Sequence, residues 1–258
     1  MSDLPLTWMA DAFRKNGLRV KEVKGWKNRG RDGTLDPRGV IFHHTVSPAN
    51  SGPAPTLGAA VKGKPKTAST PAVSGPLCNV LVDRDGTVLL IAAGISNHAG
   101  RGGPFRNIPL DSANSFLAGV EVENNGTGER WSKEFLDTLD LVFAIMLLGM
   151  RRRSKWLIGH KEWTTRKIDP ADGRGGLDME KRRAQVTKQM RVLARAKQQP
   201  SPRPKEASPT GTHVVERGDT LFEIAVRHRM SVAELKKING LESNQIHVGD
   251  KLTVRGDV

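Results

Sequence analysis

Apolar and polar residues alternate along several short stretches in the first half of the chain, which is the pattern of strands with one buried face. Residues 40–46 and 117–123 alternate in this way. Residues 77–83 and 87–93 flank Arg84-Asp85-Gly86, a turn sequence that predicts a hairpin. The pattern therefore predicts a sheet built from these strands.

The spacing of the apolar positions changes to a helical period further along the chain. Within residues 135–147 they recur three and four residues apart, Ser132 is a typical helix cap, and the basic run 151–153 suits a helix carboxyl end. Residues 177–197 predict a second, very basic helix. The apolar run 141–150 is about half the length of a membrane span, so we interpret it as a buried helix end. Strands mixed with helices indicate an α/β or α+β domain.

Proline marks the boundaries of the domains. Residues 198–211 hold four prolines in fourteen residues with almost nothing apolar, which predicts a semi-extended linker between a first domain, residues 1–197, and a second, residues 212–258. Residues 47–76 hold six prolines and four glycines. A long loop of this kind is either the lid or rim of a functional site or a disordered insertion. Residues 1–38 carry no motif, and we expect them to form a capping helix or a short extra contact with a binding partner.

Local signals agree with one another after the linker. Residues 213–216 predict a short strand, and TLFE at 220–223 and SVAE at 231–234 fit the capping box that begins a helix. Asn239-Gly240 ends the second helix, and residues 251–254 predict a closing strand. The order is strand, helix, helix, strand, in a length near the lower limit for a core without a metal or a disulfide.

This unit resembles the LysM family along its whole length, HVVERGDTLFEIAVRHRMSVAELKKINGLESNQIHVGDKLTV. The resemblance implies binding of N-acetylglucosamine-containing glycans, peptidoglycan or chitin, in a shallow groove between the loop after the first strand and the loop after the second helix. The same residues also fit a purely local role, since Asp219 and Thr220 can cap one helix and Asn239-Gly240 can end the other. The resemblance assigns Gly218, Asp219, Thr220 and Leu221 to one side of the groove and Ile238, Asn239, Gly240 and Leu241 to the other.

The composition is strongly basic, with 41 Lys and Arg against 27 Asp and Glu and a formal net charge of +14. This charge favours a polyanionic partner such as nucleic acid, an anionic membrane or a cell wall. The chain has one cysteine, Cys78, and no tyrosine. It therefore has no internal disulfide framework, no zinc module built on two or more cysteines and no tyrosine-based catalysis. Metal ligands would come mainly from its seven histidines and its carboxylates.

Polar residues interrupt two of the apolar strands. His43 and His44 point to opposite faces of one strand, so only one of them can face a given site, and the spacing alone does not say which. A hydrogen-bonded structural role is the more common one for a strand histidine. Glu121 and Glu123 share one face of another strand, which by default is a solvated face.

A third polar sequence, GHKEWTTRKIDP, places His160 nine residues before Asp169, with Lys167 two residues before Asp169. In extended backbone Lys167 and Asp169 project to the same side, and Pro170 disfavours a helix there. Two neutral histidines and one carboxylate would leave a zinc ion one open position for water, although the spacing alone is a weak signal.

In combination these sequences resemble the zinc-dependent N-acetylmuramoyl-L-alanine amidases of type 2, a family similar to peptidoglycan-recognition proteins. The resemblance runs from about residue 39 to residue 177, through VIFHHT, GPLCNVLVDRDGTV, SNHAG, GVEVEN and GHKEW…RKIDP. It implies an α/β fold with a mixed central sheet flanked by helices, and hydrolysis of the amide between N-acetylmuramic acid and the L-alanine of the stem peptide. It assigns His43, His160 and Asp169 to Zn²⁺, Glu121 to proton transfer, Lys167 to the developing oxyanion and His98 to the substrate pocket.

The chain departs from some of these relatives, which have a tyrosine near the position of Cys78 and often a histidine where Asn79 stands. Proton transfer would therefore fall to Glu121 or to a group that the sequence does not identify. We interpret Cys78 as a small core residue, and a fourth zinc ligand is the less favoured alternative.

The two resemblances together predict a peptidoglycan hydrolase, in which a glycan anchor raises the local concentration of the enzyme at the wall. Residues 1–17 contain Asp3 and no apolar core, so we expect no secretory signal. The combination looks like a bacteriophage endolysin, a monomer that waits in the host cytoplasm for a holin and has peptidoglycan as its partner, without nucleic acid or membrane insertion. The alternatives are a bacterial autolysin of the same activity and a non-catalytic binding protein with a vestigial zinc site.

The basic charge is concentrated in one region. Residues 151–211 carry 17 basic and 6 acidic side chains, residues 1–150 carry 17 and 14, and residues 212–258 carry 7 and 7. The last helix of the first domain and the linker would therefore attract anionic wall polymers, or form only a solvated helix face.

Overall fold

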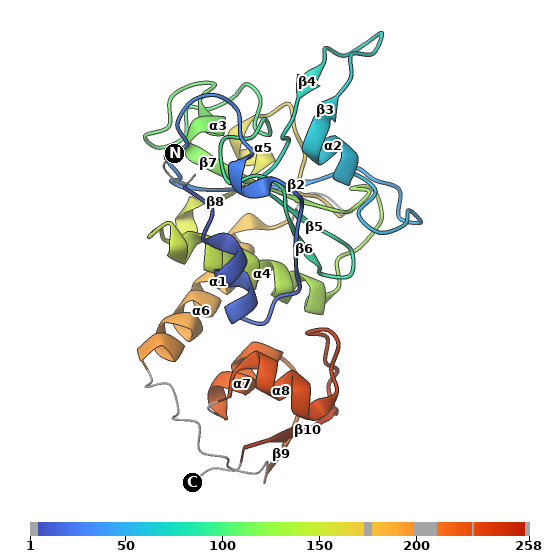
Figure 1. Cartoon of the computed structure of the whole chain (residues 1–258), viewed down its shortest axis with the longest axis vertical. Helices are drawn as coiled ribbons and strands as arrows, with labels where there is room; N and C mark the ends of the chain where they lie inside the picture. The colour runs from blue at the N-terminus through green and yellow to red at the C-terminus, as the bar shows by residue number, and fades with distance from the viewer. Residues whose placement is uncertain (1–4, 173–176, 199–210, 229, 256–258) are drawn as a thin grey trace.

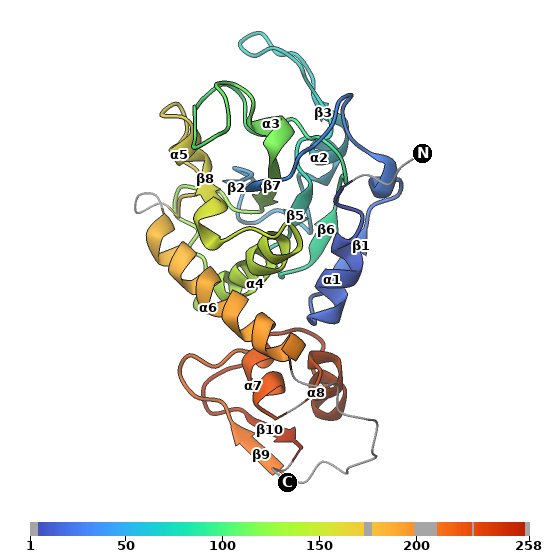
Figure 2. The ribbon, with the colours of Figure 1, turned by 90° about the vertical axis from the view of Figure 1, so that its left-hand side faces the viewer.

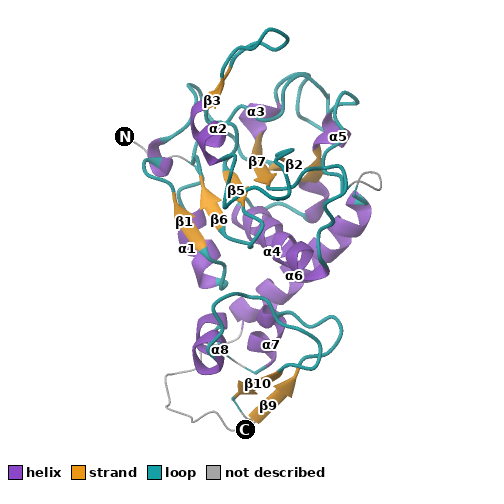
Figure 3. Cartoon of the chain, turned by 90° about the vertical axis from the view of Figure 1, so that its right-hand side faces the viewer, coloured by secondary structure: helices purple, strands orange, loops and turns teal. Residues whose placement is uncertain are grey.

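The first domain is a six-stranded sheet with helices on both faces, seen in Figure 1 and, coloured by element type, in Figure 3. The computed structural model describes residues 5–172, 177–198, 211–228 and 230–255. The strand order is β1-β6-β5-β7-β2-β8, in which β5 and β6 pair antiparallel and the other neighbours pair parallel. The predicted α/β class with a mixed sheet is confirmed. The strands are β1 (Val20–Glu22), β2 (Gly39–His44), β5 (Val80–Val82), β6 (Val88–Leu90), β7 (Leu117–Val122) and β8 (Leu157–Gly159).

Three helices cover one face of this sheet: α1 (Met9–Lys15), α4 (Lys133–Gly149) and α6 (Met179–Gln198). Alternate strand residues such as Phe42 and Val120 pack against them in the largest hydrophobic cluster. Ser132 caps α4 as predicted, because its side chain accepts a hydrogen bond from the amide of Phe135. The apolar end of α4 is buried in this layer, again as predicted.

The opposite face carries shorter elements: α2 (Leu57–Lys62), α3 (Ala113–Phe116) and α5 (His160–Trp163). They pack on two smaller clusters, one around Ile41 and Trp163 and the other around Leu81 and Ile91. His43 lies on the same strand as Ile41, two residues further on, and so points to this face between the two clusters.

Residues 47–76 are more regular than the sequence indicates. They include α2 and a two-stranded ribbon, β3 (Gly63–Lys64) and β4 (Val73–Ser74), which projects from the domain in Figure 3. Pairing of Gly63 with Ser74 closes the ribbon over a long tip of polar residues. The proline and glycine content hid these elements, because it is typical of loops.

Residues 5–38 contribute several side chains to the core of the domain. The expected capping helix is α1, whose Met9 and Phe13 are fully buried. Strand β1, which pairs with β6 at the sheet edge, was not expected. Two single-turn 3₁₀ helices complete the domain, Trp26–Asn28 and Ser154–Trp156.

The second unit has the predicted order β9 (Gly211–Val214), α7 (Leu221–Arg227), α8 (Val232–Asn239) and β10 (Lys251–Val254), with the two strands antiparallel. Ser231 and Glu234 form the predicted capping box, and Gly240 ends α8 at a φ of 64°. The predicted linker, residues 198–211, lies outside the described residues except at its two ends. Within the described ranges, no helix combines the length and the apolar character that crossing a membrane requires.

Helix α6 is basic, but one of its arginines is buried in an ion pair. Buried side chains recur along α6 at Met179, Arg182, Val186, Gln189 and Leu193, which is the face that packs on α4. Arg182 lies 2.8 Å from Asp140 of α4, and both side chains are at least nine-tenths buried. The pair therefore links the two longest helices at their contact.

Replacing Arg182 with methionine would leave Asp140 buried without its counter-charge. We expect Arg182→Met to lower the free energy of unfolding by about 3 kcal/mol, measured by urea denaturation. Arg191→Ala is the matched control, because Arg191 is an exposed arginine of the same helix, and it should change stability by less than about 0.5 kcal/mol. Equal stability of the two variants would show that the buried pair does not hold α4 to α6.

Candidate active site

The candidate site lies where the parallel strands β2, β7 and β8 end. In open α/β sheets this edge collects functional side chains, since the carboxyl ends of neighbouring parallel strands meet there. His43 is near the end of β2 and is in register with Glu121 of β7. His160 begins α5 directly after β8, and Asp169 follows in the loop after α5. The fold thus brings together residues that are 117 and 9 positions apart in the sequence.

Three ligand atoms converge at this edge. The Nδ1 atoms of His43 and His160 are 3.0 Å apart, and the Asp169 Oδ2 is 3.1 Å from the first and 3.0 Å from the second. The three residues are buried, with exposed fractions of 1%, 4% and 8%. They are a group that could hold a metal ion.

The outer ring nitrogens fix where the protons lie. His160 Nε2 is 2.9 Å from the carbonyl oxygen of Ala99, and His98 Nε2 is 2.9 Å from that of Leu117. A carbonyl only accepts, so both Nε2 atoms carry hydrogen. His98 Nδ1, unprotonated in the neutral ring, is 3.0 Å from His43 Nε2, which therefore donates to it.

The consequence is that both inner Nδ1 atoms present lone pairs toward Asp169. Burial lowers the pKa of His43 to about 4, so this ring is neutral at physiological pH. Three lone-pair donors then face one another at hydrogen-bond distance with no hydrogen between them, an arrangement that is repulsive until a cation enters. The donor set therefore fits a metal ion, and the same outer hydrogen bonds hold the two rings in orientation.

Asp169 is in its charged form at the cluster. Burial alone would raise its pKa, but contacts with His160 and His43 outweigh burial and hold the pKa well below the ordinary range of a carboxyl group. An ionised carboxylate oxygen is the form of this side chain that a divalent cation requires of a ligand.

Glu121 lies beside the cluster, on the same face of the sheet as His43. Burial, reinforced by the charge of Asp169, raises the pKa of Glu121 to about 8. Its Oε2 is buried and has no hydrogen-bond partner among the described residues. The default interpretation of this strand face as solvated is wrong for Glu123, which is 1% exposed, whereas Glu121 is half-buried.

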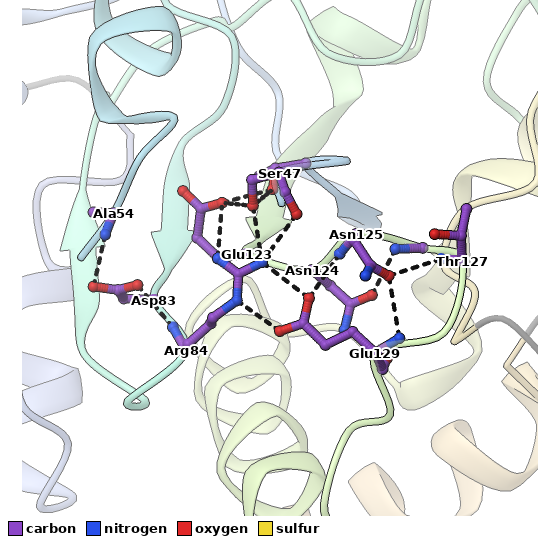
Figure 4. Close-up of polar contacts among 11 residues, drawn as sticks. Ser47, Ala54, Asp83, Arg84, Glu123, Asn124, Asn125, Thr127 and Glu129 are labelled. Carbon is purple, nitrogen blue, oxygen red and sulfur yellow. Dashed lines mark hydrogen bonds and ion pairs between the residues drawn. The ribbon is translucent and has the colours of Figure 1, made fainter. Parts of the chain in front are cut away.

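Glu123 anchors the loops around the site instead of taking part in it. It accepts hydrogen bonds from the hydroxyls of Thr45, Ser47 and Thr56, and from the amide of Thr56. Figure 4 shows the neighbouring Arg84, whose guanidinium bonds Glu129 through two nitrogens and also reaches Ser47. The network ties the loop before α2 and the loop after β7 to the sheet, and the sequence carried no signal for it.

Lys167 lies on the loop between His160 and Asp169, and its side chain is exposed. Its positive charge contributes to lowering the pKa values of His43, His44 and Glu121, so it acts electrostatically on the candidate site.

His98 is placed differently from the substrate-facing position that the resemblance implied. Its ring is 9% exposed, and both nitrogens are engaged, with His43 and with the Leu117 carbonyl. No ring nitrogen of His98 is left for a substrate. The ring fits because Gly119 has no side chain, since a Cβ there would lie 2.5 Å from it.

His44, Cys78 and Asn79 have structural positions. His44 Nδ1 accepts a hydrogen bond from the amide of Ala171, away from the ligand cluster. Cys78 is fully buried in an apolar cluster, which confirms it as a core residue. The Asn79 side chain donates to the carbonyls of Ala92 and Gly94 and accepts from Gly119 and Ser96, so all its hydrogen-bonding capacity is used inside the fold.

The two sets of predicted glycan-groove residues have different surroundings in the structure. Residues 218–221 line a cavity with Asn244, Ile246 and Val248 from the loop after α8. Ile238–Leu241 do not line it. The Asn239 side chain bonds the backbone of Leu235 and Thr253 instead, because it closes α8 onto β10. The local roles of Thr220 as a cap and Gly240 as a helix end are both present.

A buried His-His-Asp cluster beside a half-buried glutamate, at the carboxyl edge of a mixed sheet, has the parts of a metal-assisted hydrolase. The family model described as N-acetylmuramoyl-L-alanine amidase matches residues 33–172, and the LysM domain model matches residues 213–255. The first match covers more than half of the 258 residues. The chain therefore belongs to the N-acetylmuramoyl-L-alanine amidase family and carries a LysM domain after it.

Similar solved structures include a selenomethionine derivative of AmpD, with 20% identity, 66% of this chain and 94% of that chain covered, and a TM-score of 0.47. The endolysin amidase LysCS from Clostridium intestinale URNW has 17% identity, coverage of 66% and 97%, and a TM-score of 0.45. The probable peptidoglycan endopeptidase LytE of Bacillus subtilis (strain 168) is 42% identical over 45 residues, 17% of this chain. The chain thus spans only 14% of the length of this curated relative.

The cluster predicts which of the two adjacent histidines holds a metal. His43→Ala should abolish tight zinc binding, because it removes a ligand atom, whereas His44→Gln should retain it, because His44 lies outside the cluster. Equilibrium dialysis followed by elemental analysis measures the bound metal. Loss of zinc from the His44 variant and its retention by the His43 variant would reverse the assignment.

Proposed function

We propose that the chain is a zinc-dependent N-acetylmuramoyl-L-alanine amidase that hydrolyses the amide between N-acetylmuramic acid and the L-alanine of the peptidoglycan stem peptide. The observation that carries the proposal is the convergence of the His43, His160 and Asp169 lone pairs beside Glu121. Membership of the amidase family supplies the choice of bond. The LysM domain supports peptidoglycan as the partner and the cell wall as the place of action.

Two imidazole nitrogens and a carboxylate oxygen suit zinc, which in hydrolases takes three protein ligands. Zinc bound there would supply a Lewis acid for the amide carbonyl and would lower the pKa of the attacking water. His43, His160 and Asp169 would hold it.

Glu121 would carry the proton. Its Oε2 has no partner in the described structure, so it is free to accept a proton from the attacking water and to deliver it to the leaving amine. Burial supports this role, since it brings the pKa of the carboxyl group toward neutrality. The absence of tyrosine from the chain excludes a tyrosine from this task, which supports Glu121 as the carrier, the alternative being a group that the sequence does not identify.

Lys167 would stabilise the negative charge that develops on the carbonyl oxygen. Its loop position between two candidate ligands and its electrostatic effect on the cluster support this role. A donor at this place is typically worth about 3 kcal/mol in the transition state.

Exchanging Glu121 for glutamine tests the proton-transfer role. Glu121→Gln should keep stoichiometric zinc and lose at least about a hundredfold in turnover, measured as free amino groups released from purified peptidoglycan. Asp169→Ala should lose both zinc and turnover. Asp11→Asn, an exposed carboxylate on α1, is the control and should match the parent protein. Full activity of either site variant would reject the assignment, and zinc without any amide cleavage in the parent protein would favour the non-catalytic binder.

His98 would position the His43 ring, not bind the substrate. His98→Phe removes the acceptor for His43 Nε2 and should weaken zinc binding about tenfold or more, measured by competition with a chelator. His98→Gln keeps an acceptor oxygen and should recover part of the affinity. Nitrogen NMR of His43 should show the Nε2-protonated ring in the parent and a mixture in the phenylalanine variant. An unchanged chelator midpoint in His98→Phe would contradict the role.

The same chemistry would serve a bacteriophage endolysin or a bacterial autolysin. We propose the endolysin, as expected from the resemblance, held in the host cytoplasm until the membrane is opened. Expression in the cytosol of a bacterial host separates the two. An endolysin should lyse the cells only when a holin is co-expressed, and lysis without a holin would favour an exported autolysin.

A further inference from the structure

The cavity beside the LysM loop is shared between the two domains. Its LysM side is the loop 218–221 together with Asn244 and Ile246. Its other side is formed by the amidase domain, by Asp137 and Leu141 of α4 and by Gln189 of α6. Figure 2 shows the carboxyl end of α6 next to α7, and Lys188 of α6 lies 3.4 Å from Glu223 of α7.

Two of the residues that line this cavity carry a hydrogen-bond acceptor without a donor. The Gln189 Oε1 and the Asn244 Oδ1 are buried and have no partner among the described residues, and Gln189 as a whole is only 6% exposed. One acceptor belongs to the amidase domain and the other to the LysM domain. Buried acceptors are normally paired, so a ligand that carries donors toward both walls would complete the cavity.

The rest of the lining restricts the class of ligand. Leu141, Leu221, Ile246 and Val248 offer apolar surface, which suits the C–H face of a sugar ring. The charged side chains around the cavity include Glu134, Asp137, Glu216 and Asp219 against Lys133 and Arg217, an acidic excess that disfavours a polyanion. A purely apolar ligand would leave both acceptors unpaired. A neutral saccharide with hydroxyl and amide donors meets all three conditions.

We propose that helices α4 and α6 of the amidase domain form one wall of the saccharide site, so that an N-acetylated amino sugar is bound between the two domains. This rests on the proposed peptidoglycan function and adds amidase residues, above all Gln189, to glycan recognition. The bound glycan is then held at a fixed position relative to the amidase, not on an independent anchor.

The test uses the full chain and chitotetraose, an N-acetylglucosamine oligomer that has no stem peptide and so no amide for the enzyme to cut. Isothermal titration measures its dissociation constant. Gln189→Leu and Asn244→Ala should each weaken binding about fivefold, because each removes one acceptor. Arg191→Ala is the control, because Arg191 is exposed on the same helix, and this variant should bind chitotetraose as the parent protein does.

A second pair of variants tests the same wall without touching the cavity. Lys188→Glu places two like charges at the contact between α6 and α7 and should weaken chitotetraose binding, whereas adding Glu223→Lys should restore it. This cycle keeps the proposal falsifiable if Gln189→Leu is poorly folded, which its melting curve would reveal.

Three results would overturn the inference. In the first, Asn244→Ala weakens chitotetraose binding while Gln189→Leu and Lys188→Glu leave it unchanged or make it tighter. This would show that the LysM groove binds the sugar without the amidase helices, or that the helices cover the groove. Unchanged binding in all these variants would place the sugar elsewhere. No binding by the parent protein would remove the glycan role of the LysM domain, while release of amino groups from peptidoglycan would still report the amidase function separately.

Discussion

The arrangement of the site depends on one constraint, that three lone pairs must be held together although they repel one another. His43, His160 and Asp169 place two imidazole nitrogens and a carboxylate oxygen at hydrogen-bond distance from one another. The fold imposes this with hydrogen bonds on the outer sides of the two rings, to the Ala99 carbonyl and to His98. A metal ion bound there would relieve the repulsion, which would couple the affinity for the ion to the rigidity of the surrounding sheet.

The sheet supplies that rigidity through the register of its parallel strands. Pairing of β2 with β7 puts His43 opposite Glu121, so the candidate metal ligand and the proposed proton carrier are neighbours by backbone pairing and not by loop conformation. The glycine two residues before Glu121 does a second task, since Gly119 leaves the space in which the His98 ring lies against β7. Beyond the strand end, Glu123 holds the loops that surround the site. Strand β7 and the residue that follows it therefore position Glu121, leave space for the His98 ring and hold the loops around the site.

Much of this was predictable because the relevant signals are local or belong to an ordered set of motifs. Alternation gave β2, β5, β6 and β7, and the helix cap at Ser132 and the capping box at Ser231 were correct to the residue. Strand β1 was missed because three residues are too few for a periodic pattern. The hydrogen bonds of His98 and the partial burial of Glu121 depend on long-range packing, which spacing does not report. The bond from Asn239 back to β10 depends on the same long-range packing.

The basic side chains of α6 have different roles. Arg182 forms a buried ion pair with Asp140, and Arg183 forms ion pairs with Glu162 and Glu180. These two charges therefore stabilise the fold and do not attract a partner. The exposed Lys181, Arg191 and Arg195 lie on the solvated side of the helix. Because the residues that line the cavity at the LysM loop have an acidic excess, the exposed basic charge of α6 and the proposed sugar site are separate surfaces. Long-range attraction to an anionic wall and short-range recognition of a neutral sugar can therefore operate together, the first weakened by salt and the second largely independent of it.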